Sequence, residues 1–216
     1  MFCVIIANTE EREGSMETTA DYYVATDTVG CLDSKIKVTS GRYVDLSNPD
    51  PASIRLEDIA AALSKICRFG GHSPRFYSVA EHCVHATALA SSDGFTGDAL
   101  RAVFLHDATE AYVGDMVKPL KVRTPRFGDA ERRFEEAIQS AVRVDFSRWK
   151  NVIKRFDHAM LKAEKTVMWP EDTEIWDGFG DIEDRVVGFQ FWSPEEAEIR
   201  FMEVAETLQL VRRRLD

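Results

Sequence analysis

The stretch AVFLHDATEAYVGDMVKPLK, residues 102–121, joins an apolar run to a His-Asp pair and then to acids, glycine and lysines. The run is apolar on most sides of a helix, which predicts that it is buried. His106 and Asp107 offer an imidazole and a carboxylate, two ligand types that divalent metals accept. Glu110 and Asp115 add carboxylates that can move protons without being ligands. The stretch therefore predicts a buried helix that carries part of a metal site.

Helical periodicity recurs along most of the chain, and few segments alternate as strands do. We expect helices over residues 56–69, 78–90, 99–112, 129–144 and 146–168, and a last helix that begins after Ser193. Ser78 with Glu81, and Ser193 with Glu196, have the spacing of helix-capping boxes. The pattern predicts an all-α fold without internal repeats.

Three segments are expected to be irregular. Residues 36–51 read as an extended segment that ends in a turn, because its Asn-Pro and Asp-Pro pairs disfavour helix. Residues 114–128 read as a loop, since they contain Pro119 and Pro125. The tryptophans of the 169–176 loop are candidates for a base pocket formed by aromatic stacking, although burial in the core is the common fate of such side chains.

Length and charge restrict the class of protein. The chain has 216 residues, of which 44% are apolar, and this fits one domain with a sizeable core. We expect a leader without chemistry over residues 1–35 and one domain over 36–216. The formal net charge of −10 argues against a nucleic-acid polymer as partner, because phosphate binding needs faces rich in Lys and Arg.

The cysteines and the N-terminus give the expected location. Cys3, Cys31, Cys67 and Cys83 have no CxxC spacing, so we expect neither a disulfide framework nor a zinc finger. The first residues, MFCVIIA, are apolar but lack a basic region and are too short for a signal or a membrane span. These features predict a cytoplasmic protein with no membrane partner.

Four polar residues lie on or beside apolar helical stripes: His82, His106, Asp107 and Asp157. A lone polar group there costs several kcal/mol of desolvation unless it is satisfied. Two imidazoles and two carboxylates around one divalent ion leave room for water or a phosphate oxygen, as a hydrolytic site requires. Any one of the four taken singly is as often a hydrogen-bonded core histidine or a surface aspartate.

The motifs SVAEH (78–82), HDATEAYVGDMVKPLK (106–121) and D-x-x-x-L-x-x-E (157–164) together resemble the HD-domain phosphohydrolase superfamily. That resemblance implies an all-α HD-domain helical bundle with the metal site between its central helices. The segments GRYVDL, ICRFGGH and FYSVAEH resemble the compact bacterial and phage branch of the superfamily. This branch contains bacterial deoxynucleoside 5′-monophosphatases and phage dATP triphosphohydrolases.

Carried over position by position, the resemblance makes His82, His106, Asp107 and Asp157 the metal ligands. It makes Glu110 the acid that positions or deprotonates the attacking water. It also implies roles for Asp115, as a second carboxylate near the scissile phosphate or sugar, and for Arg68, as a phosphate-binding group ahead of the first ligand. Zn²⁺, Mn²⁺ and Co²⁺ all suit such a ligand set, so the metal stays open.

Three further residues are candidates for substrate binding. Lys118 and Lys121 follow Asp115 and would hold additional phosphates as point charges, although exposed lysines are often only solvated. His72 would assist phosphate binding, whereas His85 and His158 are expected to be packed or exposed histidines.

The resemblance leaves several functions in competition. We expect hydrolysis of deoxynucleoside triphosphates of the dATP type, by attack of a metal-bound water on phosphorus. The alternative is a deoxynucleoside 5′-monophosphatase. A di-iron oxygenase, with His72 or His85 as extra ligands, and a non-catalytic nucleotide-binding protein are the remaining readings. The long amphipathic helices after Asp129 lead us to expect a homo-oligomer.

Overall fold

The computed structural model describes residues 34–176 and 182–211. The expected leader lies, up to residue 33, outside the described residues. Of the described residues 57% are helical and 5% are in strands, so the all-α expectation is confirmed at this level. Within these two ranges, no helix is long and apolar enough to cross a membrane.

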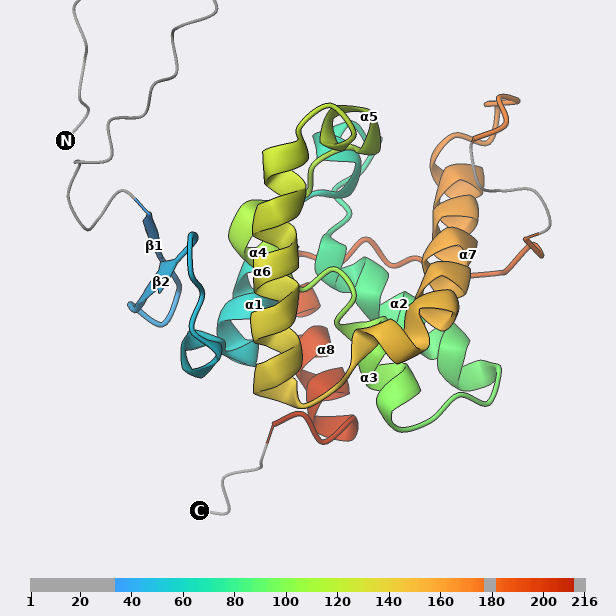
Figure 1. Ribbon diagram of the computed structural model, residues 1–216. Coiled ribbons are helices and arrows are strands. Elements are labelled where there is room, and N and C mark those ends of the chain that lie inside the picture. The colour runs from blue at the N-terminus through green and yellow to red at the C-terminus, as the bar shows by residue number, and fades with distance from the viewer. Residues whose placement is uncertain (1–33, 177–181, 212–216) are drawn as a thin grey trace, which may run out of the picture. The chain divides into compact units, whose positions relative to one another are not determined.

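The elements follow one another as two short strands and then eight α-helices within the described ranges (Figure 1). They are β1 (Lys35–Lys37), β2 (Tyr43–Asp45), α1 (Leu56–Leu63), α2 (Val79–Ser92), α3 (Asp98–Phe104), α4 (Glu110–Val113), α5 (Lys118–Lys121), α6 (Pro125–Val142), α7 (Lys150–Met168) and α8 (Pro194–Thr207). The strands pair antiparallel, with Ile36 opposite Val44. The sequence predicts an extended segment over residues 36–51 that ends in a turn, but it does not predict that this segment folds back on itself as a hairpin.

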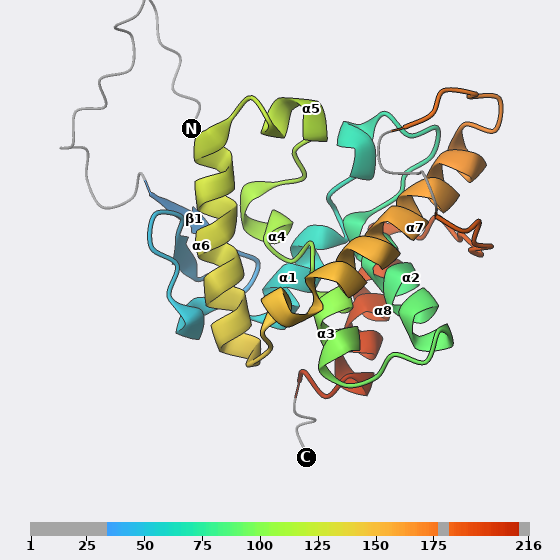
Figure 2. The same cartoon turned by 45° about the vertical axis from the view of Figure 1, so that its right-hand side comes forward.

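Helix α2 is central, since it packs against α3, α7 and α8 (Figures 1 and 2). It begins as its capping box predicts, with the Ser78 hydroxyl accepting the backbone N–H of Glu81 at 3.1 Å. Its buried face includes His82 and Cys83. The placement of α2 therefore brings a histidine into the middle of the helical core.

Two groups of buried apolar side chains hold the helices together. The larger group joins α1, α2, α3, α4, α6 and α8, and includes Phe104, Phe134 and Phe201. The smaller group fixes α7 on α2 and α3 through Phe156 and Met160. Phe156 directly precedes Asp157, and its buried ring anchors this part of α7 to the core.

The first predicted helix is too long. It ends at Leu63, and a 3₁₀ turn, Arg68–Gly71, follows where the prediction continues the helix to residue 69. The chain leaves the helix because it pairs with the segment before α2: the N–H of Arg68 donates to the carbonyl of Tyr77 at 3.0 Å. Local periodicity does not reveal this pairing, and the Arg68 side chain that follows from it contacts Asp107 and Glu164.

The predicted continuous helix over 99–112 is also wrong. Helix α3 ends at Phe104 and α4 begins at Glu110, so His106 and Asp107 lie in the turn between them. The ring Nδ1–H of His106 donates to the carbonyl of Val103 at 2.7 Å, an acceptor that a continuing helix would use for the N–H of Asp107. The histidine side chain thus helps to end the helix on which the sequence places it.

The region between α4 and α7 is more helical than the sequence predicts. The predicted loop over 114–128 contains the short helix α5. Helix α6 begins at Pro125 rather than at residue 129, since proline is favoured in the first turn. Helix α7 is preceded by a 3₁₀ turn, Phe146–Trp149. The last helix begins as predicted, with the Ser193 hydroxyl accepting the N–H of Glu196 at 3.2 Å.

The segment before α8 is tied to α2 by Glu81. Its buried carboxylate accepts the backbone N–H groups of Gln190, Phe191 and Trp192 at 2.8–3.0 Å. Burial alone would raise the pKa of Glu81, but the hydrogen bonds from His85 and from these three N–H groups hold it below its ordinary value. The charged form therefore stabilises the fold.

We expect Glu81→Gln to lower the free energy of unfolding by about 1.5–3 kcal/mol at pH 7, the usual range for hydrogen bonds to a charged group. Because the pKa is lower in the folded state, this contribution is complete above the unfolded pKa of about 4.3 and is lost as pH falls through the folded pKa. Urea unfolding at pH 7 and at acidic pH measures both effects, with the exposed Glu57→Gln as control. If the free energies of unfolding of Glu81→Gln and wild type differ as much at acidic pH as at pH 7, this role of Glu81 is contradicted.

Candidate metal centre and cavity

The four predicted ligands converge between α2, the turn after α3, and α7. The two Nε2 atoms of His82 and His106 are 3.3 Å apart. Oδ2 of Asp107 lies 3.2 Å from the His106 Nε2 and 3.7 Å from the His82 Nε2. Oδ1 of Asp157 lies 3.5 Å and 3.7 Å from the same two atoms. Residues that are up to 75 positions apart in the sequence thus present four potential ligand atoms to one point.

The outer hydrogen bonds of the two imidazoles fix their tautomers. Nδ1–H of His82 donates to Oε1 of Glu164 at 2.6 Å, and Nδ1–H of His106 donates to the carbonyl of Val103 at 2.7 Å. In the neutral rings, both Nε2 atoms therefore carry lone pairs, and they face each other and two carboxylates. Four acceptors at this distance repel one another unless positive charge lies among them.

A divalent cation fits this donor set. Ligand atoms at 2.0–2.2 Å from one ion are about 3.0–3.5 Å apart. The two Nε2 atoms are separated from each other and from the two carboxylate oxygens by similar distances, 3.2–3.7 Å. Burial alone would lower the pKa of His106, but the carboxylates of Asp107 and Asp157 raise it well above its ordinary value. Protons therefore compete with a metal for the centre. Two overlapping groups in the described residues could bind a metal, namely His82 with His106 and Asp157, and Cys83 with His106 and Asp107. The donor atoms do not fix which metal.

Glu164 is a buried carboxylate that hydrogen-bonds to three side chains, and the sequence alone assigns no role to it. Its Oε1 accepts His82 Nδ1–H at 2.6 Å and the hydroxyl of Tyr77 at 2.9 Å, and its Oε2 accepts Arg68 Nη2 at 3.1 Å. A carboxylate behind a ligating histidine orients the ring and makes it a better donor. The only sequence signal is the spacing Asp157, Leu161, Glu164, which puts all three on one face of α7.

We expect Glu164→Gln to weaken metal binding by about 10- to 100-fold, as for other partners of metal-bound histidines. The amide keeps the volume but loses the charge that favours the Nδ1–H tautomer of His82. Titration of the purified variant with Zn²⁺ or Co²⁺ measures the change, and the exposed Glu171→Gln is the control. Unchanged affinity would show that Glu164 acts only in packing.

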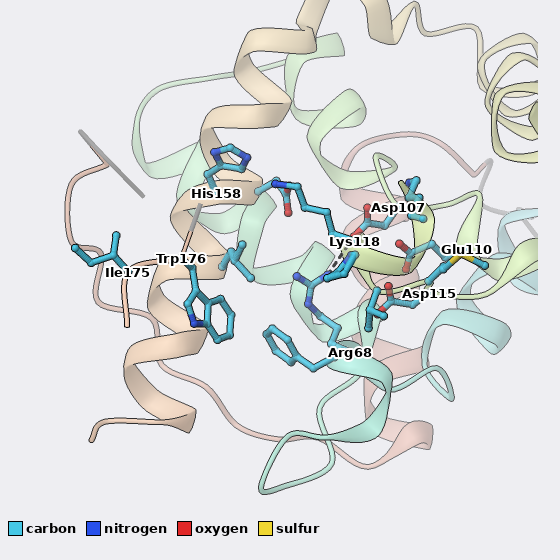
Figure 3. Close-up of a pocket in the computed structure, with 15 residues that line it drawn as sticks. Arg68, Asp107, Glu110, Asp115, Lys118, His158, Ile175 and Trp176 are labelled. Atoms are coloured by element: carbon cyan, nitrogen blue, oxygen red, sulfur yellow. Dashed lines mark hydrogen bonds and ion pairs between the residues drawn. The ribbon is translucent and has the colours of Figure 1, made fainter. Parts of the chain in front are cut away.

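A cavity of about 780 Å³ opens beside the ligands (Figure 3). Asp107 and Asp157 line it, as do the predicted site residues Glu110 and Asp115. Oε2 of Glu110 is buried and has no hydrogen-bond partner within the described ranges. Burial, together with the charges of Asp107 and Asp115, raises the pKa of Glu110 well above its ordinary value. This carboxyl group can therefore hold a proton beside the centre.

Arg68 also lines the cavity, and Figure 3 shows it between Trp176 and the acids Glu110 and Asp115. Its Nη1 lies 3.3 Å from Oδ2 of Asp107, and its Nη2 lies 3.1 Å from Oε2 of Glu164. Its buried Nε finds no hydrogen-bond partner in the described part of the chain. Because a guanidinium has five N–H donors, Arg68 can hold these two carboxylates and still contact an anion.

The two lysines lie where the sequence suggests, on α5 at the cavity edge. Lys118 and Lys121 both line the cavity, and Lys118 projects toward its interior in Figure 3. Nζ of Lys121 is 2.6 Å from Oε1 of Glu131. Lys118 is therefore the better placed of the two to meet a substrate directly.

The remaining histidines are dispersed. His72 is exposed and does not line the cavity, so its predicted substrate contact has no support from the geometry. His85 stacks on Trp192 with ring centres 5.2 Å apart and also does not line the cavity. His158 lines it, beside Asp157 on α7. Of these three, the structure brings only His158 to the cavity.

Comparison with models of known protein families finds no match. The uncharacterized protein YfdR of Escherichia coli K12 is 38% identical over 148 residues, which are 66% of this chain and 77% of that protein. An uncharacterized protein of Rhodobacter capsulatus is 33% identical over 157 residues, which are 70% of this chain and 78% of that protein. With this identity over more than three quarters of the relative's length, the chain belongs to the family of the Escherichia coli protein YfdR.

Proposed function

We propose that the protein is an HD-domain phosphohydrolase that depends on a divalent transition metal and hydrolyses deoxynucleoside triphosphates of the dATP type. The observation that carries this proposal is the meeting of His82, His106, Asp107 and Asp157 at the wall of a cavity that also holds basic side chains. The motifs that resemble HD-domain phosphohydrolases contain these same four residues.

The residues around the centre have separable tasks. The four acceptor atoms would hold the cation, which supplies polarisation of a phosphoryl oxygen and a lowered pKa of water. Arg68 orients the phosphate by charge-assisted hydrogen bonds. Glu110 positions the attacking water and accepts its proton at Oε2, for which it must be ionised. Burial and the charges of Asp107 and Asp115 raise the pKa of Glu110, and a cation beside Asp107 would favour the ionised form because it offsets the second of these causes.

The chemistry is the replacement of one P–O bond by another. The oxygen of water bonds to phosphorus, and the bond from phosphorus to the leaving oxygen breaks. One proton of the water passes to Glu110, and the leaving oxygen takes a proton from solvent or from a neighbouring acid. Asp115, which lines the cavity near Glu110, is placed to contact the sugar or the phosphate. Burial raises the pKa of Asp115, and this favours a form that can donate a hydrogen bond.

A triphosphate needs more cationic partners than a monophosphate, and Lys118 and Lys121 supply them at the cavity edge. The second candidate function, a deoxynucleoside 5′-monophosphatase, is favoured by a specific contact. Lys121 is already paired with Glu131 at 2.6 Å, which leaves fewer free charges for a polyphosphate.

The predicted cytoplasmic location and homo-oligomeric state remain predictions from the sequence.

A panel of deoxynucleoside mono-, di- and triphosphates, incubated with metal-reconstituted protein, tests the proposal. Identification of the products separates the candidates. A triphosphohydrolase releases triphosphate or successive phosphates from a triphosphate, whereas a monophosphatase releases free deoxynucleoside from a monophosphate alone. Absence of hydrolysis of every nucleotide by metal-loaded protein would contradict both.

We expect joint replacement of Lys118 and Lys121 by alanine to raise KM for triphosphates much more than KM for monophosphates. The lysines would bind phosphates beyond the one at the metal, so their loss removes binding energy that a monophosphate does not use. Steady-state kinetics on both substrates measures this, with the exposed pair Lys150→Ala and Lys154→Ala as control. An equal rise for both substrates would argue against polyphosphate binding.

A further inference from the structure

The cavity has two chemically different ends. The metal-ligand end carries Asp107, Glu110 and Asp115. The other end is lined by aromatic and aliphatic carbon from Phe69, Leu161, Ile175 and Trp176. Figure 3 shows Trp176 across the cavity from Glu110 and Asp115, with Arg68 between them. A ligand with a charged end and a flat apolar end would match this division.

The indole of Trp176 is held in place from outside the cavity. Its side chain hydrogen-bonds to Asp172. Nζ of the buried Lys165 lies 2.7 Å from the backbone oxygen of Asp172 and 3.1 Å from its Oδ2. The same Nζ lies 5.5 Å from the centre of the Trp176 ring, and Lys165 does not line the cavity. The ring therefore has a fixed orientation before any ligand arrives.

Two further aromatic rings support the indole. Trp169 and Phe69 contact Trp176 with ring centres 5.7 Å and 6.2 Å away, and they contact each other edge to face at 5.1 Å. Phe69 has a φ of 58°, which lies in the left-handed region that L-residues rarely adopt. Such strain is found where the surrounding structure requires a particular side-chain position. Here the left-handed backbone at Phe69 lets the Arg68 side chain contact Asp107 and Glu164, while the Phe69 ring contacts Trp169 and Trp176.

The aromatic cluster formed by Phe69, Trp169 and Trp176 is accessible to solvent rather than part of the core. Trp176 and Phe69 are only partly buried, and Ile175 beside them is 88% exposed. A cluster that served only to close the 169–176 loop would have no need to line the same cavity as the metal ligands. An accessible, rigid ring beside an anion site is the arrangement that binds a planar aromatic group by stacking.

We propose that Trp176, supported by Phe69 and Trp169, stacks on the base of the nucleotide and makes the site select phosphate esters that carry a planar aromatic ring. This inference rests on the proposed function, since it assumes that a phosphate occupies the other end. It deepens that function by assigning the residues that hold the base, which the proposed function leaves open. It also gives the 169–176 loop a role in substrate binding.

Equilibrium binding without turnover tests the stacking. The probes are a non-hydrolysable 5′-phosphonate analogue of deoxyadenosine monophosphate and the matching deoxyribose phosphonate that lacks the base. Calorimetry on the metal-loaded full chain compares wild type with Trp176→Ala and Trp176→Phe, and the fully exposed Val186→Ala serves as control. Thermal unfolding of each variant verifies its fold, and the phenylalanine variant retains a ring if the alanine variant does not fold.

We expect Trp176→Ala to weaken binding of the base-containing probe by about 10-fold and to leave binding of the base-free probe unchanged. Trp176→Phe should retain most of the affinity for the base-containing probe. If Trp176→Ala weakens binding of both probes equally, or of neither, the stacking proposal is overturned. If wild type binds both probes equally, the stacking is wrong and the phosphohydrolase proposal stands. If wild type binds neither probe, the phosphate site itself is absent and both proposals are overturned.

Discussion

Replacement of Asp107 by alanine is expected to abolish both metal binding and turnover. Oδ2 of Asp107 lies 3.2 Å from the His106 Nε2 and is one of four acceptors around one point. Its loss removes a charged ligand and leaves the guanidinium of Arg68, 3.3 Å from that oxygen, to repel a cation. Metal analysis after dialysis and hydrolysis assays on the same sample measure both effects.

Two variants keep the Asp107 result interpretable. Asp107→Asn preserves the volume and is expected to lose most of the metal without unfolding, because the amide is a weak ligand in place of a charged one. The exposed Asp129→Ala should keep wild-type metal content and rate. An Asp107→Ala protein with full metal and full activity would remove this residue, and the proposed ligand set with it, from the centre.

Glu110→Ala is expected to retain metal and to lose at least about 100-fold in kcat, the scale of lost acid–base assistance. The expectation rests on the position of Glu110, which lines the cavity but is not one of the four converging acceptors. Its Oε2 is buried and has no hydrogen-bond partner among the described residues. Glu110→Gln should behave in the same way, since the amide cannot accept the proton.

The control for Glu110 is Glu57→Ala, an exposed acid in the first turn of α1 that does not line the cavity. Metal content and kcat must be measured together, because the combination distinguishes proton transfer from ligation. Near-normal kcat with full metal would refute the role in proton transfer. Loss of metal in parallel with activity would instead make Glu110 a ligand.

Local signals in the sequence predict much of the helical framework. The Ser78 and Ser193 caps are confirmed because their hydrogen bonds involve neighbours three residues away. The end of the first helix and the break between α3 and α4 are not predicted. The first depends on pairing with the segment around Tyr77, and the second on where the His106 ring donates. The helical periodicity of the sequence reveals neither the pairing with the Tyr77 segment nor the hydrogen bond of the His106 ring.

The four candidate ligands are predicted because polar residues on apolar stripes are unusual and require partners. Their convergence in the structure supports that reasoning. Glu164 is missed because its partners, Arg68, Tyr77 and His82, are more than 80 residues away along the chain. The sequence shows an acid on a helix, and only tertiary packing makes it the group that orients a histidine.

Anomalous diffraction from crystals soaked with Mn²⁺, Co²⁺ or Zn²⁺ tests the central claim most directly. We expect one strong peak about 2.0–2.2 Å from the Nε2 atoms of His82 and His106 and from a carboxylate oxygen each of Asp107 and Asp157. A peak elsewhere, or full metal content with no peak among these four side chains, would contradict the account.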